Sequence, residues 1–208
     1  MSSPISSEHI QQYQAIHRNT RYGVSGYKFV PHIQLCVLEL RPATLLDYGC
    51  GQTDMTQAVQ DFGLELHRYD PAIPAISTLA INRADLVVNT DVLEHIPEEG
   101  IEPYLKHIAS LTTHALFSIS TCLAQEILPN GQNAHCSVKE PEEWLQIIRQ
   151  HFPQSELLKT SRRNTALILT WKSKARPLIE LADEHYVLRR RAEKLSIKRI
   201  LRRLIGKK

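Results

Sequence analysis

The sequence predicts a three-layer α/β fold, in which helices cover both faces of a doubly wound, mostly parallel sheet. Three observations support this prediction. Short apolar segments alternate with amphipathic helical segments along the chain, a pattern typical of parallel sheets. The first apolar segment runs into a glycine-containing turn at Asp47–Gly51. The last two apolar segments, 155–161 and 164–171, meet across Arg162 and Arg163 and are expected to form an antiparallel hairpin.

The individual elements follow from local signals. Helices are expected where apolar residues recur at helical spacing or where proline marks a helix end, over 7–17, 30–40, 55–62, 102–111 and from Pro141 onward. Strands are expected in the short apolar runs at 45–47, 64–69, 85–89 and 115–120, followed by the closing hairpin. Residues 71–84 are few and interrupted by proline, yet they must supply any helix and strand between the second and fourth strand positions.

Composition indicates one folded domain with an unusual distribution of charge. The chain has 208 residues, of which 42% are hydrophobic and 23% charged, as in soluble globular proteins. No apolar run approaches the ~20 residues that a membrane span requires, and the N-terminus lacks the layout of a signal peptide. Four cysteines without a C-x-x-C pair favour reduced thiols. These features predict a cytoplasmic protein.

The charge lies unevenly along the chain. The net charge is +3, but residues 189–208 hold ten basic residues and one acid, which is +9. Residues 1–188 therefore hold 15 basic and 21 acidic residues, which is −6. Apolar residues recur among the cations at near-helical spacing, at Leu188, Leu195, Leu201, Leu204 and Ile205.

This pattern predicts a basic amphipathic helix, for which three interpretations stay open. The helix could lie on an anionic membrane surface, bind the phosphate backbone of a nucleic acid, or form a solvated or disordered end. The absence of aromatic residues from 189–208 argues against base stacking and makes a nucleic acid the less favoured partner. We therefore expect three regions: N-terminal helices and a loop over 1–41, a core over 42–173, and a basic extension over 174–208.

The turn after the first strand has the composition of a cofactor site. Gly49 and Gly51 allow the backbone to approach a ligand where a Cβ atom would clash. A dinucleotide fingerprint would have a third glycine where this chain has Asp54. Acids at Asp47 and Asp54 suit a cationic ligand better than a pyrophosphate. Asp70 ends the second strand, 23 residues after Asp47, where a carboxylate can accept both hydroxyls of a ribose.

Two segments together resemble a known family. The pattern acid-x-G-x-G at Asp47–Gly51, followed by the segment Ala84–Pro97 with its Val92-Leu93-Glu94-His95, is similar to the class I S-adenosylmethionine (AdoMet) methyltransferases. The resemblance runs from about Val30 to Trp171. It implies a seven-stranded sheet with a terminal antiparallel hairpin. It also implies AdoMet as the cofactor, bound by Asp47, Gly49, Gly51, Asp70, Asn89 and, from the loop before the core, Tyr22.

A second group of residues resembles a metal site found in some of these enzymes. Asp91, Glu94 and His95 are spaced i, i+3, i+4 and would share one side of a helical turn. Ubiquinone-pathway O-methyltransferases and small-RNA 2′-O-methyltransferases use a similar arrangement, the latter with a later histidine that His135 matches. The resemblance implies that Asp91, Glu94, His95 and His135 bind Mg²⁺, Mn²⁺ or Fe²⁺. Without a metal, His95 or His135 is the expected general base, with Asp91 beside it.

The sequence therefore predicts an AdoMet-dependent methyltransferase that acts on a hydroxyl of a saccharide, a lipid-linked or another small-molecule acceptor. RNA 2′-O-methylation and a non-catalytic AdoMet-fold adaptor at a membrane are the alternatives. A nucleotide-dependent oxidoreductase is disfavoured by Asp54 and by the terminal hairpin. We expect the enzyme in the cytoplasm, or peripherally at the inner face of the membrane. Because residues 71–84 are fewer than in class I relatives, the residues that hold adenine are not assigned.

Overall fold

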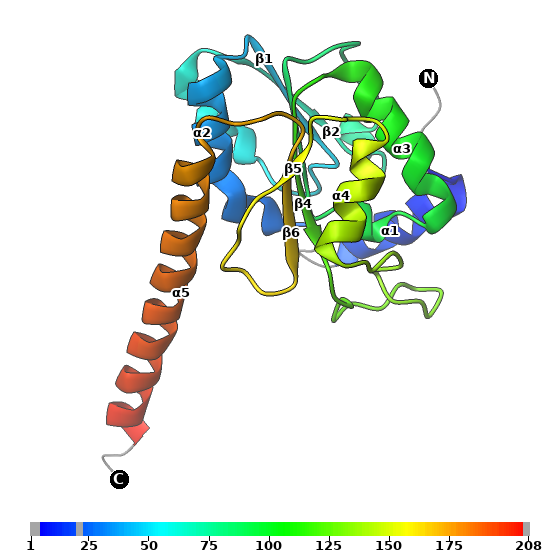
Figure 1. Cartoon of the computed structure of the whole chain (residues 1–208). Coiled ribbons are helices and arrows are strands. Elements are labelled where there is room, and N and C mark those ends of the chain that lie inside the picture. Colours follow the sequence, from blue (N-terminus) through cyan, green and yellow to red (C-terminus); the bar gives the residue numbers. More distant parts are fainter. Residues whose placement is uncertain (1–4, 20–22, 206–208) are drawn as a thin grey trace.

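The computed structural model describes residues 5–19 and 23–205 and shows one twisted sheet between two layers of helices (Figure 1). The sheet has six strands, in the order β2-β1-β3-β4-β6-β5. Their bounds are Thr44–Tyr48 (β1), Glu65–Tyr69 (β2), Leu86–Thr90 (β3), Ala115–Ser120 (β4), Glu156–Leu157 (β5) and Thr165–Leu169 (β6). Strands β1 to β4 are parallel, whereas β6 runs antiparallel to β4 and β5. The predicted closing hairpin is confirmed.

The order of the strands sets the position of the site. From β1 the chain goes first to β2 on one side and then to β3 on the other. Connections that leave a sheet in opposite directions open a crevice between the carboxyl ends of the two neighbouring strands. Here that crevice lies beyond Tyr48 and Thr90, where β1 and β3 end.

The expectation of seven strands is wrong for the described residues, which form six. The missing strand would have come from residues 71–84, which contain a single 3-10 turn, η3 (Pro74–Ile76). A crossover to a further parallel strand needs a dozen or more residues in addition to the strand itself. Pro71 and Pro74 also lack the N–H that a sheet ladder requires. Strand β2 therefore forms the edge of the sheet.

Alternating strand residues form the two faces of the core. One face packs against α3 (Glu98–Leu111) and α4 (Pro141–Arg149) and includes Leu46, Val87 and Phe117. The other packs against α2 (Val30–Leu40), the 3-10 segment η2 (Met55–Phe62) and the start of α5 (Arg176–Ile205), and it includes Leu45, Val88 and Leu116. The expected α-helix over 55–62 is thus a 3-10 helix. Helix α1 (Ser7–Asn19) lies across the carboxyl end of the sheet (Figure 1).

Helix α5 begins against α2 and then extends away from the rest of the molecule (Figure 1). Of the predicted apolar positions, Leu188 and Leu195 share one face of the helix, since each residue turns by about 100°. Ile197, which was not among the predicted positions, lies about 200° further round than Leu195. The predicted apolar positions Leu201, Leu204 and Ile205 lie outside the part whose side chains are described. Within residues 5–19 and 23–205, no helix has the length and apolar character to cross a bilayer.

Candidate active site

The turn after β1 requires glycine at two positions. Gly49 has a φ of +81° and Gly51 a φ of +55°, values that favour glycine. The N–H of Gly49 donates to the Tyr69 carbonyl over 2.7 Å. A Cβ atom on Gly51 would lie 2.5 Å from the carbonyl oxygen of Gly23, and one on Gly49 would lie 2.8 Å from the Val92 side chain. The turn therefore packs closely between the loop before α2 and the segment after β3, with no room for a side chain at either glycine.

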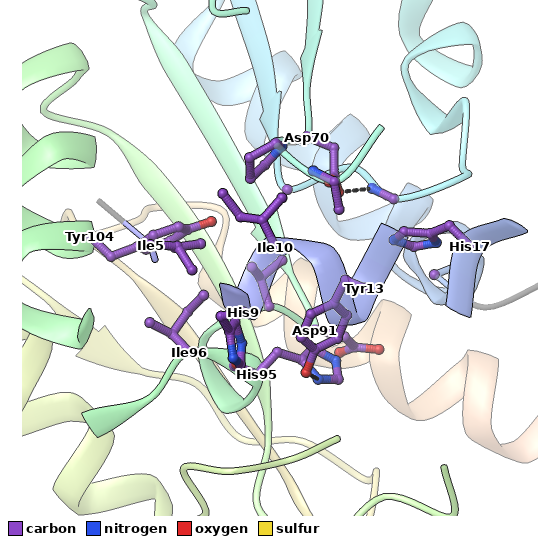
Figure 2. A pocket seen from close by; sticks show the side chains of 16 residues that line it. Ile5, His9, Ile10, Tyr13, His17, Asp70, Asp91, His95, Ile96 and Tyr104 are labelled. Carbon is purple, nitrogen blue, oxygen red and sulfur yellow. Dashed lines mark hydrogen bonds between the residues drawn. The ribbon is translucent and has the colours of Figure 1, made fainter. Parts of the chain in front are cut away.

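Asp70 connects the end of β2 to this turn. Its carboxylate accepts the Gly51 N–H over 2.8 Å and the Ala72 N–H over 2.8 Å. Figure 2 shows Asp70 at the edge of a cavity under the glycine turn. We call this the glycine-loop cavity; it is lined by Ile5, His9, Ile10, Tyr13, His17, Gly23, Gly49, Gly51, Asp70, Pro71, Ala72, Asp91, Val92, His95, Ile96 and Tyr104.

Helix α1 closes the glycine-loop cavity from the side opposite the sheet (Figure 2). Tyr13 donates its hydroxyl proton to the Ala134 carbonyl over 2.7 Å, and Nε2 of His9 lies 2.7 Å from the carbonyl oxygen of His95. The sequence predicted a helix over 7–17, but nothing in it indicated what this helix covers. The contribution of α1 to the site is visible only in the tertiary structure.

Two of the predicted cofactor residues lie beneath the turn rather than in the cavity lining. Asp47 is fully buried, and neither of its carboxylate oxygens has a hydrogen-bond partner among the described residues. Burial raises its pKa well above the ordinary range, against the opposing charge of Arg68. Asn89 donates its side-chain amide to the Tyr48 carbonyl over 2.7 Å and so ties β3 to β1. Tyr22 lies outside the described residues.

A second, more open pocket lies on the other side of the segment that follows β3. It has a volume of about 840 Å³. We call it the histidine pocket; its walls come from η1 (Ser25–Phe29), η4 (Leu93–His95), the loop 120–126, His135 and the hairpin turn 162–165. Asp91 and His95 line both the histidine pocket and the glycine-loop cavity. These two residues therefore stand where the two spaces meet.

Three of the predicted metal ligands converge in the histidine pocket. The ligand atoms of Glu94, His95 and His135 all lie within 4.8 Å of one another. Nδ1 of His95 lies 2.8 Å from the Ala134 carbonyl oxygen, and Nδ1 of His135 is hydrogen-bonded to the Cys122 carbonyl. A carbonyl can only accept, so each Nδ1 carries the proton and each Nε2 carries the lone pair. Histidines that bind metals are commonly oriented in this way.

Burial sets the electrostatics of these groups: Glu94 lacks a compensating positive charge of its own, and His95 offers a neutral imidazole. Glu94 is fully buried; its Oε1 accepts the Ser120 N–H over 2.9 Å, and its Oε2 has no hydrogen-bond partner among the described residues. Burial, assisted by the charge of Asp91, raises the pKa of Glu94 well above its ordinary range. Burial also lowers the pKa of His95 to about 4, so this imidazole is neutral at pH 7. One carboxylate oxygen and two imidazole nitrogens form a ligand set that suits Mn²⁺ or Fe²⁺ better than Mg²⁺.

Asp91 does not join this cluster, so the structure does not bring together the four ligands that the resemblance implied. Its Oδ2 lies 3.1 Å from Nζ of Lys28, and its Oδ1 accepts the hydroxyl of Ser118 over 2.8 Å. Burial would raise the pKa of Asp91, but Lys28 and these hydrogen bonds outweigh it and lower the pKa. Asp91 has a φ of +54°, and η4 begins only at Leu93. The expected helical turn from Asp91 to His95 is therefore absent.

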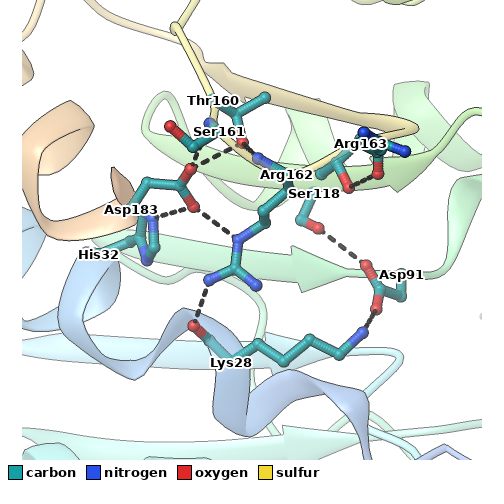
Figure 3. Close-up of polar contacts among 10 residues, drawn as sticks. Lys28, His32, Asp91, Ser118, Thr160, Ser161, Arg162, Arg163 and Asp183 are labelled. Carbon is teal, nitrogen blue, oxygen red and sulfur yellow. Dashed lines mark hydrogen bonds and ion pairs between the residues drawn. The ribbon is translucent and has the colours of Figure 1, made fainter. Parts of the chain in front are cut away.

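Lys28 is itself held by a polar chain that reaches α5 (Figure 3). The guanidinium of Arg162 donates to the Lys28 carbonyl over 2.9 Å and pairs with Asp183 of α5. Asp183 also accepts the Thr160 hydroxyl and the Ser161 N–H, each over 2.8 Å. The structure thus links the base of α5 to the edge of the histidine pocket. Nothing in the sequence distinguished Asp183 from the other acids of its helix.

The strand order, the glycine turn and the acid-ended strand β2 define a doubly wound fold of the class that binds nucleotide-like cofactors. A sequence profile for a methyltransferase domain matches residues 30–173. The chain belongs to this family, the class I AdoMet-dependent methyltransferases. It is therefore an enzyme of the transferase class whose cofactor is AdoMet.

Solved structures show the same fold at low sequence identity. The 1,6-didemethyltoxoflavin N1-methyltransferase of Burkholderia thailandensis, solved with S-adenosylhomocysteine, is 17% identical with a TM-score of 0.50, over 78% of this chain and 84% of that one. Human N-acetylserotonin methyltransferase, solved with AdoMet, is 15% identical with a TM-score of 0.52, over 80% and 56%. The methyltransferase domain of a bacterial Hen1 protein is 12% identical with a TM-score of 0.53, over 69% and 97%. No curated protein matches the sequence.

Proposed function

We propose that the protein transfers the methyl group of AdoMet to a hydroxyl of a small-molecule or saccharide acceptor that occupies the histidine pocket. The observation that carries this proposal is the position of Asp91 and His95, which line both that pocket and the glycine-loop cavity. A cofactor on one side and an acceptor on the other would meet at these two residues. Methyl transfer by direct displacement depends mainly on such positioning.

On the cofactor side, the protein contributes backbone and carboxylates. Gly51 lets the turn pack directly against the Gly23 backbone, which a Cβ atom would meet, and so holds the turn in place beside the cavity. Asp70 lines the cavity, and its carboxylate oxygens keep lone pairs for ribose hydroxyls in addition to the two N–H groups they accept. AdoMet supplies the methyl group on a sulfonium. The carboxylates of Asp70 and Asp91, which line the cavity, suit that positive charge.

On the acceptor side, Glu94, His95 and His135 would hold a divalent cation. A bound cation lowers the pKa of a neighbouring hydroxyl and so favours its attack at neutral pH. The chain orients the ligands, because the carbonyls of Ala134 and Cys122 fix the two imidazole rings. The unpartnered Oε2 of Glu94 is the strongest single indication, since a buried carboxylate oxygen without a donor is costly unless it is protonated or bound.

The dimensions of the histidine pocket favour a small acceptor. Its volume of about 840 Å³ lies within the usual range for small-molecule sites, roughly 300–1,000 Å³. Exposed Leu123 and Val24 form an apolar part of its lining, and Arg162 and Arg163 line it as cations. This mixture suits a ring with polar substituents, as in a phenol or a sugar. RNA 2′-O-methylation is the alternative, and an acceptor screen separates the two.

Metal binding can be tested before the acceptor is known. Metal-free protein is titrated with Mn²⁺ by calorimetry, and we expect one site per chain that is lost in Glu94→Gln. The matched control is Glu126→Gln, which changes another carboxylate of the same pocket outside the cluster. Equal Mn²⁺ affinity in wild type and Glu94→Gln would remove the metal from the proposal and leave His95 or His135 as the general base.

The acceptor is then sought by following the release of S-adenosylhomocysteine from AdoMet. Metal-loaded enzyme is offered phenols, sugars, nucleotide sugars and short RNA with a free 3′ end. Turnover with a phenol or sugar that stops on chelation supports the proposal. Turnover with RNA alone would replace a small acceptor by a nucleic-acid acceptor at the same site.

A further inference from the structure

Helix α5 carries a row of exposed leucines on the face turned away from the molecule. Leu178, Leu181, Leu188 and Leu195 are 57%, 59%, 54% and 68% exposed. On the opposite face, Ile179 and Asp183 are fully buried against the domain. At about 100° per residue, the four leucines lie within one stripe roughly 100° wide. We call these four residues the leucine stripe.

The spacing of the leucine stripe is that of a helix-pairing surface. Leu181, Leu188 and Leu195 follow one another at intervals of seven residues, the repeat that keeps a seam facing a partner helix. Leu178, three residues before Leu181, begins a second row that continues through His185 and Ala192. Single exposed leucines are common on protein surfaces, but four aligned on a projecting helix indicate a covered face.

The charges beside the leucine stripe indicate which partner covers it. Glu184 and Arg191 flank the stripe along the same edge, seven residues apart and almost symmetric about Leu188. Both are exposed, and neither forms an ion pair with any residue that the structure describes. A second α5 running in the opposite direction would place Glu184 against Arg191 of the partner helix, twice by symmetry.

We propose that two copies of this chain pair through the leucine stripe of α5 in an antiparallel arrangement. The distribution of charge along the chain favours this direction. The +9 segment 189–208 of each copy would then extend toward the other copy's residues 1–188, which carry −6. A parallel pair would place two +9 segments side by side, which is unfavourable. The inference does not depend on the proposed methyl acceptor or on the metal.

An anionic membrane explains the stripe less well. The cations of 189–197 would favour such a surface, but the first half of the stripe is bordered by the exposed acid Glu184, which anionic lipids repel. A nucleic acid would use the cations and leave the leucines uncovered. Only a second α5 satisfies both the leucines and the opposite charges on one edge.

The test is the molar mass of full-length protein by size-exclusion chromatography with light scattering, at tens of micromolar. We expect twice 23.8 kDa for the wild type and a single copy for Leu188→Glu. The matched control is Ile127→Glu, because Ile127 is equally exposed, at 54%, but lies in a loop away from α5. A monomeric wild type, or a dimer that survives Leu188→Glu, overturns the proposal.

A charge exchange tests the direction of pairing. Glu184→Arg alone and Arg191→Glu alone should each weaken the dimer at least several-fold, and the double variant should restore it. In a parallel pair, Glu184 would face Arg189 of the partner helix, so the double variant would not recover. Failure of the double variant to recover therefore overturns the antiparallel arrangement.

Distance gives an independent readout of the same direction. Spin labels at position 195 should lie roughly 25 Å apart in the antiparallel dimer and about 10 Å apart in a parallel one, given 1.5 Å of rise per residue. Circular dichroism of each variant shows that α5 remains helical. If the protein is monomeric and binds anionic vesicles through Leu188, the partner of the leucine stripe is a membrane and not a second copy, and the proposal is overturned.

Discussion

The glycine-loop cavity and the histidine pocket meet at Asp91 and His95, yet they are built in different ways. The cavity takes its glycine turn and its Asp70 carboxylate from residues 49–72, directly after β1 and β2, and α1 and the segment after β3 complete its lining. The histidine pocket takes its groups from segments between residues 23 and 165. A site for a shared cofactor can thus rest on a short motif and backbone geometry. A site for a particular acceptor is assembled from side chains that only the fold brings together.

A substitution in the glycine turn should show the largest difference between the cofactor half of the site, the glycine-loop cavity, and the acceptor half, the histidine pocket. Gly51→Ala should lower AdoMet affinity by roughly 100-fold, or about 2.7 kcal/mol, because its Cβ atom would lie 2.5 Å from the Gly23 carbonyl oxygen. Calorimetry with AdoMet measures this change, and Mn²⁺ affinity should persist. The control is Gly63→Ala, which has a similar φ of +71° but no atom within 4 Å of its Cβ position. If both variants lose AdoMet alike, backbone strain and not the close approach is responsible.

Asp70→Asn tests the carboxylate of the same cavity. Loss of the charge-assisted hydrogen bonds to ribose should cost about 2 kcal/mol, a decrease of roughly 30-fold in AdoMet affinity. Asp85→Asn is a matched control, because Asp85 also accepts two backbone N–H groups, those of Ala43 and Thr44, but at the opposite end of β3. Unchanged AdoMet affinity in Asp70→Asn would refute the assignment of ribose to this residue.

Tyr13→Phe tests a contact between the cofactor half and the acceptor half of the site. The hydroxyl donates to the Ala134 carbonyl, which in turn accepts from His95. Its loss should lower Mn²⁺ affinity by about 10-fold, the lower range for residues that orient metal ligands, and leave AdoMet affinity nearly unchanged because the ring remains. Tyr27→Phe removes the hydroxyl of an exposed tyrosine as a control. A loss of AdoMet affinity instead would place the hydroxyl in the cofactor half.

Loss of the contact between α5 and the domain, in Asp183→Asn, should change the affinity for AdoMet and Mn²⁺ least. Its effect should appear in the stability of the protein at acid pH. Although burial raises the pKa of Asp183, hydrogen bonds from His32, Thr160, Ser161 and Arg162 hold it well below the ordinary value. Its stabilising contribution is therefore complete above that value, about 3.9, and is lost as the pH falls below it. Urea unfolding between pH 7 and pH 3 should show a shallower decline for Asp183→Asn than for wild type.

Glu193→Gln is the control for this measurement. Glu193 lies on the same helix and pairs with Arg189 and Arg190 in an exposed position, where an ion pair contributes little. Its pH profile should match that of the wild type. An Asp183→Asn profile that also matches the wild type would show that this carboxylate does not anchor α5.

The local sequence determined the fold class and the cofactor half of the site. Short apolar runs identified β1, β3, β4 and the closing hairpin, because strands buried on both faces read as near-continuous apolar segments. The start of α4 was also readable from Pro141, which favours the first turn of a helix. In the structure, Glu140 and Glu143 form a capping box there. Gly49, Gly51 and Asp70 could be found because a tight turn and a strand end constrain residues that are close in the chain.

Only the tertiary structure decided how the acceptor half is composed. The family resemblance implied four ligands, Asp91, Glu94, His95 and His135. Asp91 instead adopts a left-handed conformation, and its carboxylate pairs with Lys28 away from the cluster. Helical spacing describes side chains only where the backbone is helical. The covering role of α1 and the anchoring of Arg162 by Asp183 arise from contacts across more than twenty residues, and such contacts leave no periodic signal in a single sequence.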